Sequence, residues 1–478
     1  MRIGQTSFIV FVAKMGGSAI GFVSTIYFAR ELGATILGYY ALTIALVAWL
    51  RLVGDLGVGS AMVKRMSEGE YPDVYATTSA SLMTVISISL AGTVLVFREY
   101  IKTYIGKPVV SLVAILLLVG LFESFGLSAL RGERKVHISG LLGSIGIGVK
   151  SLLQIGFVAV GFGLGGMLAG YAVGSVLVGI TALSLLSAGF ARPTRHHVRS
   201  LYKYAKFSWL GSLKDRSFND VDILLLGVFV QSSFVGVYSV AWSLASFLTL
   251  FDSAVSSTLF PEFSRAEAED SHESISNLIE QSLTFGGLFL IPGLFGAALL
   301  GNRLLRIYGS EFVNGYNVLW LLVLATMLYA YQKQFITVLN GIDRPDAAFR
   351  VNAVFIVMNV VLNLVFIQMI GFVGAAIATV LSAGLGVLFA WLALRSVVEF
   401  NLPLGEVGRQ FAAAGIMSLV VSTAEILLDA TAFEHSLGTV VVLVVVGVLT
   451  YFLTLFGISE TFRTTVVNNV NLRPSLSG

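Results

Sequence analysis

Long apolar segments recur from one end of the chain to the other, about every 30 to 40 residues, without a polar linker between them. A helix needs about 20 mostly apolar residues to cross the hydrocarbon core of a bilayer. The sequence therefore predicts an all-α integral membrane protein with about fourteen transmembrane helices. They are expected at residues 7–29, 36–62, 77–97, 109–130, 137–161, 164–188, 205–231, 234–260, 278–301, 315–340, 346–369, 372–394, 407–428 and 437–458.

The composition agrees with a lipid environment. Charged residues make up 12% of the chain and hydrophobic residues 56%, whereas a soluble domain carries about 25% charged residues. The net charge is only +3 and the basic residues are scattered, so no nucleic-acid partner is expected. The chain has no cysteine and no Walker-type phosphate loop, and His196 and His197 lack metal-ligand spacing. We therefore expect no catalytic residues, no metal site and no cofactor.

Basic residues predict the orientation, because Lys and Arg in short loops are retained on the cytoplasmic side. With both termini in the cytoplasm, eighteen of the thirty basic residues fall in cytoplasmic segments and six in external loops. Lys14 interrupts the first apolar run and no A-x-A-like cleavage site closes it, so this run is expected to remain as the first helix. The prediction is a multi-pass protein of the cell membrane with cytoplasmic termini.

The second half of the chain repeats part of the first, a common way to build transporters. Adding 209 to the residue number carries Leu130–Gly132 onto Leu339–Gly341, Glu123 onto Gln332, Lys150 onto Asn359, Gln154 onto Asn363 and Gly165 onto Gly374. A looser repeat at an offset of 198 joins Gly38–Ala41 to Gly236–Ser239. We expect an N-terminal six-helix lobe (residues 1–190), a cytoplasmic linker (191–206), a C-terminal six-helix lobe (207–396), and two further helices with a cytoplasmic tail (397–478).

Twelve charged residues lie deep inside the predicted spans, away from their ends, where each costs about 2.5–3.5 kcal/mol at a helix centre unless it meets water or a partner. They are therefore expected to line a hydrated cavity or to neutralise one another. The candidate substrate-binding cations are Lys14, Arg51, Lys150, Lys214 and Arg216. The candidate cavity acids or ion-coupling residues are Asp55, Glu123, Asp215, Asp220, Asp222 and Asp252. The twelfth, Lys333, is close enough to the cytoplasmic end of its span to snorkel.

The span at 205–231 carries a polar stripe that is expected to line the cavity. The stripe consists of Ser208, Ser212, Asp215, Asn219 and Asp222. Beside it, Arg216 and Asp220 are four residues apart and can pair.

Two basic residues of the first lobe have open interpretations. Arg51 and Asp55 are also four residues apart, so they form either a self-satisfied pair or a site where the guanidinium grips a phosphate. Lys150 has no acidic residue in its own span, and we expect it to face the cavity.

Several short motifs, in this order, resemble the polysaccharide transporter family of the multidrug, oligosaccharidyl-lipid and polysaccharide exporter superfamily. They are Phe28–Gly33 (FARELG), Gly38–Ala41 (GYYA), Gly54–Gly57 (GDLG), Asp222–Gly227 (DILLLG), Gly236–Tyr238 (GVY) and Leu339–Gly341 (LNG). The resemblance runs through most of the chain. It implies a two-lobed, V-shaped bundle that alternates between inward and outward openings, with cationic cavity residues that would here be Lys14, Arg51, Lys150 and Lys214.

The resemblance implies a flippase that carries a polyprenyl or dolichyl (pyro)phosphate-linked sugar from the cytoplasmic to the outer leaflet. The expected partners are this lipid-linked sugar, the bilayer, a coupling ion (H⁺ or Na⁺) and glycan-assembly enzymes. A cation-coupled multidrug exporter of the same superfamily is the alternative, because the second lobe holds four acids against three bases among its in-span charges. A membrane glycan polymerase is disfavoured, because the external loops hold only about a dozen residues or fewer.

Overall fold

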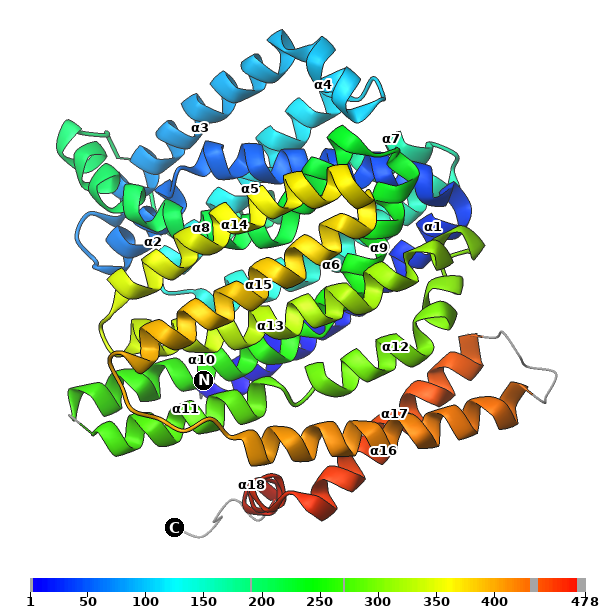
Figure 1. Ribbon diagram of the computed structural model, residues 1–478. Coiled ribbons are helices and arrows are strands. Elements are labelled where there is room, and N and C mark those ends of the chain that lie inside the picture. The colour runs from blue at the N-terminus through cyan, green and yellow to red at the C-terminus, as the bar shows by residue number, and fades with distance from the viewer. Residues whose placement is uncertain (1–2, 190, 270, 430–436, 471–478) are drawn as a thin grey trace. The chain divides into compact units, whose positions relative to one another are not determined.

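The computed structural model describes residues 3–189, 191–269, 271–429 and 437–470, and every regular element in these ranges is a helix (Figure 1). The chain divides into two compact units, residues 1–239 and 240–478. This confirms the predicted all-α membrane fold, since the helices of both units include many that are long and apolar enough to cross a bilayer.

Unit 1 contains the helices up to α8 and the first half of α9. Their bounds are α1 (Ile3–Asp55), α2 (Val58–Ser67), α3 (Pro72–Val96), α4 (Arg98–Ile105), α5 (Val110–Gly132), α6 (Val136–Ala159), α7 (Gly163–Ser184), α8 (Arg195–Phe229) and α9 (Ser232–Phe247).

Unit 2 contains the second half of α9 and the remaining helices. Their bounds are α10 (Thr249–Ala268), α11 (His272–Gly286), α12 (Leu290–Arg306), the 3₁₀ helix η1 (Ser310–Gly315), α13 (Tyr316–Gly341), α14 (Pro345–Ile370), α15 (Phe372–Arg395), α16 (Leu404–Asp429), α17 (Leu437–Ile458) and α18 (Glu460–Val470).

The boundary between the units lies inside α9, whereas the sequence places the start of the second lobe at residue 207. The difference arises because α8 packs against α1 and α2, and so joins the first unit. The division into lobes at 190 and 207 stays a prediction.

The first two predicted spans are one helical element with a kink. Gly33 lies inside α1 with φ 76° and ψ 172°, a backbone conformation that glycine adopts without a steric penalty. The prediction of one continuous helix over 36–62 is wrong, because the chain turns at Leu56 (φ 43°) and Gly57 (φ 77°) before α2 begins. Apolar residues lie on both sides of this turn, so the predicted span was drawn across it.

Two further predicted spans are also broken. The span at 234–260 consists of α9 and α10, which meet at Leu248, and the span at 278–301 consists of α11 and α12, which are separated by residues 287–289. Eleven segments of the described chain meet the length and hydropathy expected of a membrane helix, and one of them, Val12–Asp55, covers two predicted spans. Neither α8 nor the α9–α10 pair is among the eleven, so the number fourteen stays a prediction.

The packing within each unit repeats, as the sequence predicts. In unit 1, α7 packs against α5 and α6, and in unit 2, α15 packs against α13 and α14. The turns that precede α6 and α14 also match, since Arg134 (φ 62°) and Asp343 (φ 55°) are both left-handed and are 209 residues apart. In the same turns, the N–H of Lys135 donates to the carbonyl of Leu130 over 2.9 Å, and the N–H of Arg344 donates to that of Leu339 over 2.8 Å.

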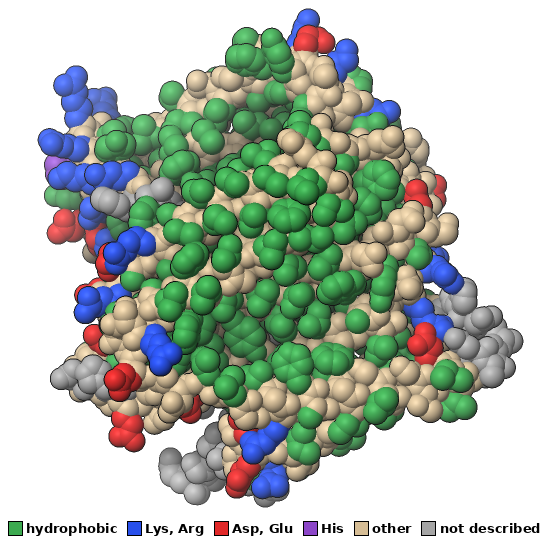
Figure 2. Space-filling view, in the orientation of Figure 1, with side chains coloured by type: hydrophobic (Ala, Val, Ile, Leu, Met, Phe, Trp, Pro, Cys, Tyr) green, Lys and Arg blue, Asp and Glu red, His purple; other side chains and the backbone are tan. Residues whose placement is uncertain are grey.

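The outer faces of α14 and α15 are covered by hydrophobic side chains, whereas charged side chains gather where the helices end (Figure 2). Along α14, the exposed fractions of Val357 and Met369 reach 59% and 72%. Apolar side chains exposed at this density over the full length of a helix are suited to contact with lipid.

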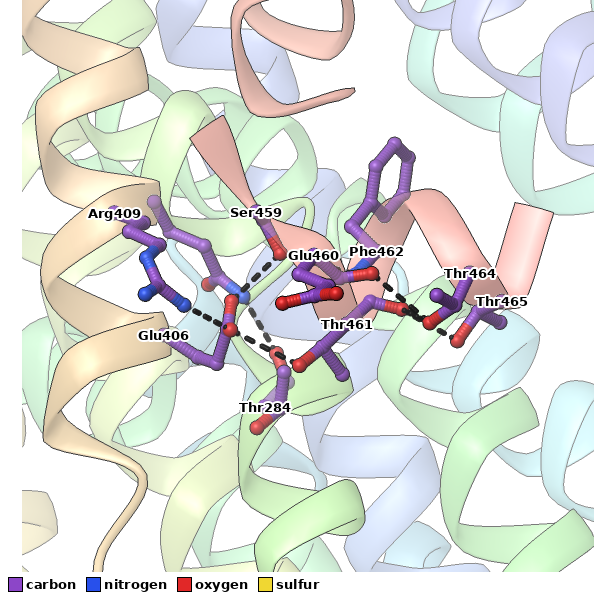
Figure 3. Close-up of polar contacts among 10 residues, drawn as sticks. Thr284, Glu406, Arg409, Ser459, Glu460, Thr461, Phe462, Thr464 and Thr465 are labelled. Atoms are coloured by element: carbon purple, nitrogen blue, oxygen red, sulfur yellow. Dashed lines mark hydrogen bonds and ion pairs between the residues drawn. The ribbon is translucent and has the colours of Figure 1, made fainter. Parts of the chain in front are cut away.

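In unit 2, the carboxylate of Glu406 forms hydrogen bonds with residues at the start of the last helix, α18 (Figure 3). Glu406, near the start of α16, accepts hydrogen bonds from Ser459 (2.7 Å) and Thr461 (3.0 Å) and pairs with Arg409. The Ser459 hydroxyl also accepts from the N–H of Phe462 over 3.0 Å, so it caps α18. These contacts fix the direction in which α18 leaves α17.

Candidate functional site

The strongest polar contact inside unit 1 joins α5 to α6. The Lys150 ammonium lies 2.7 Å from both carboxylate oxygens of Glu123, and these side chains are 13% and 8% exposed. The same ammonium lies 4.7 Å from the ring centroid of Tyr171 on α7, a cation–π distance. We call Glu123, Lys150 and Tyr171, together with Gln154 and Tyr40, the polar cluster of unit 1.

Gln154 extends the polar cluster one helical turn along α6. Its side-chain amide donates to the Tyr40 hydroxyl of α1 and to the carbonyl of Met167 of α7, each over 2.8 Å. The cluster therefore joins α1, α5, α6 and α7 through buried polar contacts.

Close approach of α6 and α7 makes this arrangement possible. A Cβ atom at Gly174 would lie 2.6 Å from the Cγ atom of Lys150, and one at Gly170 would lie 2.6 Å from the backbone nitrogen of Gln154. Glycines four residues apart form the small-residue face by which membrane helices approach closely.

Arg51, on α1, packs against α5. A Cβ atom at Gly120 would come within 2.8–2.9 Å of the Arg51 side chain, so the guanidinium lies directly on the backbone of α5. The carboxylate of Asp55 accepts from the N–H groups of Gly57 and Gly59, each over 3.1 Å. Asp55 therefore stabilises the turn between α1 and α2, and this contact favours neither interpretation of Arg51.

On α8, the predicted pair is confirmed: a guanidinium nitrogen of Arg216 lies 2.9 Å from a carboxylate oxygen of Asp220. Asp222 is 2% exposed and accepts a short hydrogen bond from the Tyr238 hydroxyl of α9. Lys214 is also buried, at 6% exposure.

The remaining candidates are spread out. Lys14 is exposed on α1 and Asn219 is exposed on α8. Ser208 donates to the carbonyls of Gly57 and Ala205. The side chains of Ser212, Asp215 and Asp252 lie outside the described part of the chain, so the stripe on α8 and the roles of these acids stay predictions.

In unit 2, neutral amides occupy the positions that correspond to the ion pair. Gln332 and Asn359 stand where the repeat places Glu123 and Lys150, and both are fully buried. The Asn359 amide donates to the Ser382 hydroxyl over 3.1 Å. Within the described residues, the side-chain oxygens of Gln332 and Asn359 have no hydrogen-bond partner.

The glycines of the looser repeat meet each other. A Cβ atom at Gly38 would lie 1.8 Å from the carbonyl oxygen of Ser232, and one at Gly236 would lie 1.9 Å from that of Ala34. Here α1 and α9 touch backbone to backbone, which only glycine permits.

Sequence reasoning missed Tyr171, Tyr40 and the contact between Gly38 and Gly236. Tyr40 belongs to the GYYA motif, but neither that motif nor the apolar span around Tyr171 assigns a hydrogen-bonding or cation–π role to these tyrosines. The two glycine motifs were visible as a repeat, but a repeat does not predict that its copies touch.

Comparison with known proteins gives consistent results. Residues 27–315 match the family described as "Polysaccharide biosynthesis protein". The chain is 32% identical to "Probable flippase AglR" of Haloferax volcanii over 97% of both chains. It is also 30% identical to "Probable low-salt glycan biosynthesis flippase Agl15" of the same organism, over 85% of this chain and 87% of that protein.

Among solved structures, the chain resembles "Lipid II flippase MurJ, inward closed conformation" with a TM-score of 0.79. The similarity covers 96% of this chain and 100% of that chain, at 18% sequence identity. At this level of identity the likeness establishes the fold.

Proposed function

Because this chain belongs to the family of polysaccharide biosynthesis proteins, we propose that it is a flippase for lipid-linked sugars. It would move a polyprenyl or dolichyl (pyro)phosphate-linked saccharide from the cytoplasmic to the outer leaflet by alternating access of two lobes. Surface glycan, polysaccharide or glycoprotein assembly would consume the product. The chain is a multi-pass membrane transporter rather than an enzyme.

One observation carries this proposal: the similarity to a probable flippase runs through 97% of both chains. The cations within apolar helices suit an anionic substrate, because charged side chains at bilayer depth mark substrate and ion pathways.

We assign the first phosphate contacts to Arg51 and Lys150. A guanidinium binds phosphate in a bidentate geometry, and the Arg51 guanidinium lies against the backbone of α5 at Gly120. Lys150 is held by Glu123, so a substrate phosphate would replace that carboxylate as its partner. Further contacts with the substrate or a coupling ion are assigned to Lys14, Lys214, Arg216, Asp55, Asp215, Asp220, Asp222 and Asp252.

The coupling ion would be H⁺ or Na⁺. The buried amide oxygens of Gln332 and Asn359 support Na⁺, because hard cations prefer oxygen ligands and buried polar atoms without a partner call for an explanation. Replacing external Na⁺ by choline at constant pH should then slow transport, whereas dependence on pH alone would favour H⁺.

The proposal is tested by measuring how fast a lipid-linked sugar reaches the outer leaflet of vesicles that contain the purified protein. Arg51→Ala should lower this rate about tenfold to a hundredfold, since a charge-assisted contact contributes about 1.5–3 kcal/mol. Arg51→Lys should retain part of the activity, because lysine keeps the positive charge but cannot bind phosphate in the bidentate geometry of a guanidinium. The exposed Lys64→Ala is the matched control.

Two outcomes would contradict the proposal. The first is unimpaired flipping by the triple variant Arg51→Ala, Lys150→Gln, Glu123→Gln. This result would mean that these residues do not contact the substrate during transport. Extrusion of lipophilic cations by vesicles that do not flip the lipid-linked sugar would indicate the multidrug exporter instead.

A further inference from the structure

The first twelve residues of α8 form a basic helix in front of a predicted membrane span. The whole helix has 35 residues, whereas about 20 cross the hydrocarbon core. Five basic residues occur between Arg192 and Lys206, and no Asp or Glu occurs anywhere between Glu133 and Asp215. This segment therefore continues beyond the bilayer core, and all of its charged residues are basic.

One side of this segment is packed onto unit 1. Leu201 is fully buried and Ala205 is 4% exposed, and both belong to a core cluster with residues of α2 and α3. Tyr75 of α3 also bonds to Ser200 through its hydroxyl, over 3.3 Å. The packed side is thus fixed against the protein.

The opposite side carries the charges. Arg195, Arg199 and Lys203 are four residues apart and exposed, and Leu201 is two residues from each of the last two. Two residues correspond to about 200° around a helix, so this cationic stripe points away from the packed side. Within the described residues, none of these three side chains forms an ion pair with a carboxylate.

Apolar and aromatic groups flank the cationic stripe. Tyr202 is 68% exposed and Val198 is 36% exposed. Figure 2 shows Lys and Arg side chains gathered at the side of unit 1 where α8 begins. An exposed tyrosine between basic residues, directly before a span, is typical of the membrane–water interface.

We propose that the cationic stripe (Arg195, Arg199 and Lys203) binds the headgroups of anionic phospholipids in the cytoplasmic leaflet. Basic clusters next to a membrane helix are attracted to anionic lipid surfaces, by roughly fivefold in affinity for each basic residue. The stripe faces away from unit 1, so the surrounding leaflet supplies its ligand. Lipid binding there would hold the cytoplasmic end of α8, the helix that carries Lys214, Arg216 and Asp222. The inference rests on the cytoplasmic placement of residues 191–206 and holds whatever the transported substrate is.

The test uses the full chain in micelles of a neutral detergent. Because the native chain has no cysteine, Val198→Cys provides a single site for an environment-sensitive fluorophore. Phosphatidylglycerol, phosphatidylcholine and inorganic pyrophosphate are titrated separately. We expect a saturable response to phosphatidylglycerol that weakens with salt, and no comparable response to phosphatidylcholine.

The triple variant Arg195→Gln, Arg199→Gln, Lys203→Gln should bind phosphatidylglycerol at least tenfold more weakly. A control with the same loss of charge, Arg98→Gln, Lys102→Gln, Arg306→Gln, should bind it like the parent. Equal binding by the triple variant and the parent would overturn the proposal. So would a response to pyrophosphate as strong as that to phosphatidylglycerol, which would make the stripe a site for soluble phosphates.

Discussion

At the residue scale, Lys150 and Glu123 form a mostly buried ion pair in which each side chain depends on the other. Removing two charges from water is costly, and their attraction offsets the cost only when the geometry is good and both partners are present. Here both carboxylate oxygens lie 2.7 Å from the ammonium and the ring of Tyr171 covers it. The loss of one partner should therefore be far more harmful than the loss of both.

Lys150→Met alone should lower the free energy of unfolding by about 3–5 kcal/mol, because it leaves the Glu123 carboxylate buried without a partner. The double variant Lys150→Met, Glu123→Leu should recover most of that loss. Unfolding in mixed micelles, followed by tryptophan fluorescence, measures both values. Additive losses in the double variant would show that the two side chains do not stabilise each other.

Asp55 offers a second residue-scale prediction, because its carboxylate accepts from two N–H groups at the start of α2. Asp55→Ala should cost about 0.5–2 kcal/mol of stability, the usual loss when a helix cap is removed. Asp55→Asn keeps an oxygen acceptor and should cost less. If Asn proves as harmful as Ala in the same unfolding measurement, the negative charge of Asp55 matters more than its hydrogen bonds.

At the scale of elements, the glycine contact between α1 and α9 predicts a conformational effect. Gly38→Val cannot be accommodated while the backbones touch, because even a Cβ atom would overlap the carbonyl of Ser232. The variant should therefore separate α1 from α9. A single cysteine at Ser239, which lies about two turns beyond Ser232 on α9, should then react several-fold faster with a hydrophilic thiol reagent.

The matched control for this experiment is Gly92→Val on α3, where a Cβ atom meets nothing within 4 Å. It should leave the reactivity at position 239 unchanged. An equal increase with both variants would indicate general loosening of the unit instead of a specific contact.

Sequence patterns predicted the helices well and their interruptions badly. Apolar length is sufficient to locate a membrane helix, so α3, α5, α6, α14 and α17 begin and end within a few residues of the expected bounds. The turn at Leu56 and Gly57 is decided by backbone dihedrals and by the carboxylate of Asp55, to which hydropathy is insensitive. The four-residue spacing on one helix likewise predicted the ion pair between Arg216 and Asp220. The ion pair between Lys150 and Glu123 joins two helices, so sequence spacing alone did not predict it.

At the scale of the whole molecule, the predicted orientation can be tested directly. A reporter that is active only in the cytoplasm should be active both when inserted after Pro193 and when fused to Gly478, because basic residues are concentrated in the segments assigned to that side. A reporter inserted between Lys102 and Lys107 should be inactive. Activity at only one of the first two positions would mean that the number of spans between them is odd.

The side chains at the repeated positions, Glu123 and Lys150 in unit 1 and Gln332 and Asn359 in unit 2, carry no net charge, and this affects the electrical work of transport. One elementary charge that crosses the membrane field gains or loses about 2.3 kcal/mol per 100 mV. Lys150 and Glu123 sum to zero charge, and Gln332 and Asn359 carry none. When Lys150 and Glu123 move together as a pair, they therefore move no net charge through the transmembrane voltage. Voltage dependence of turnover would then come from separation of this pair, other charged side chains, the cargo or a co-transported ion.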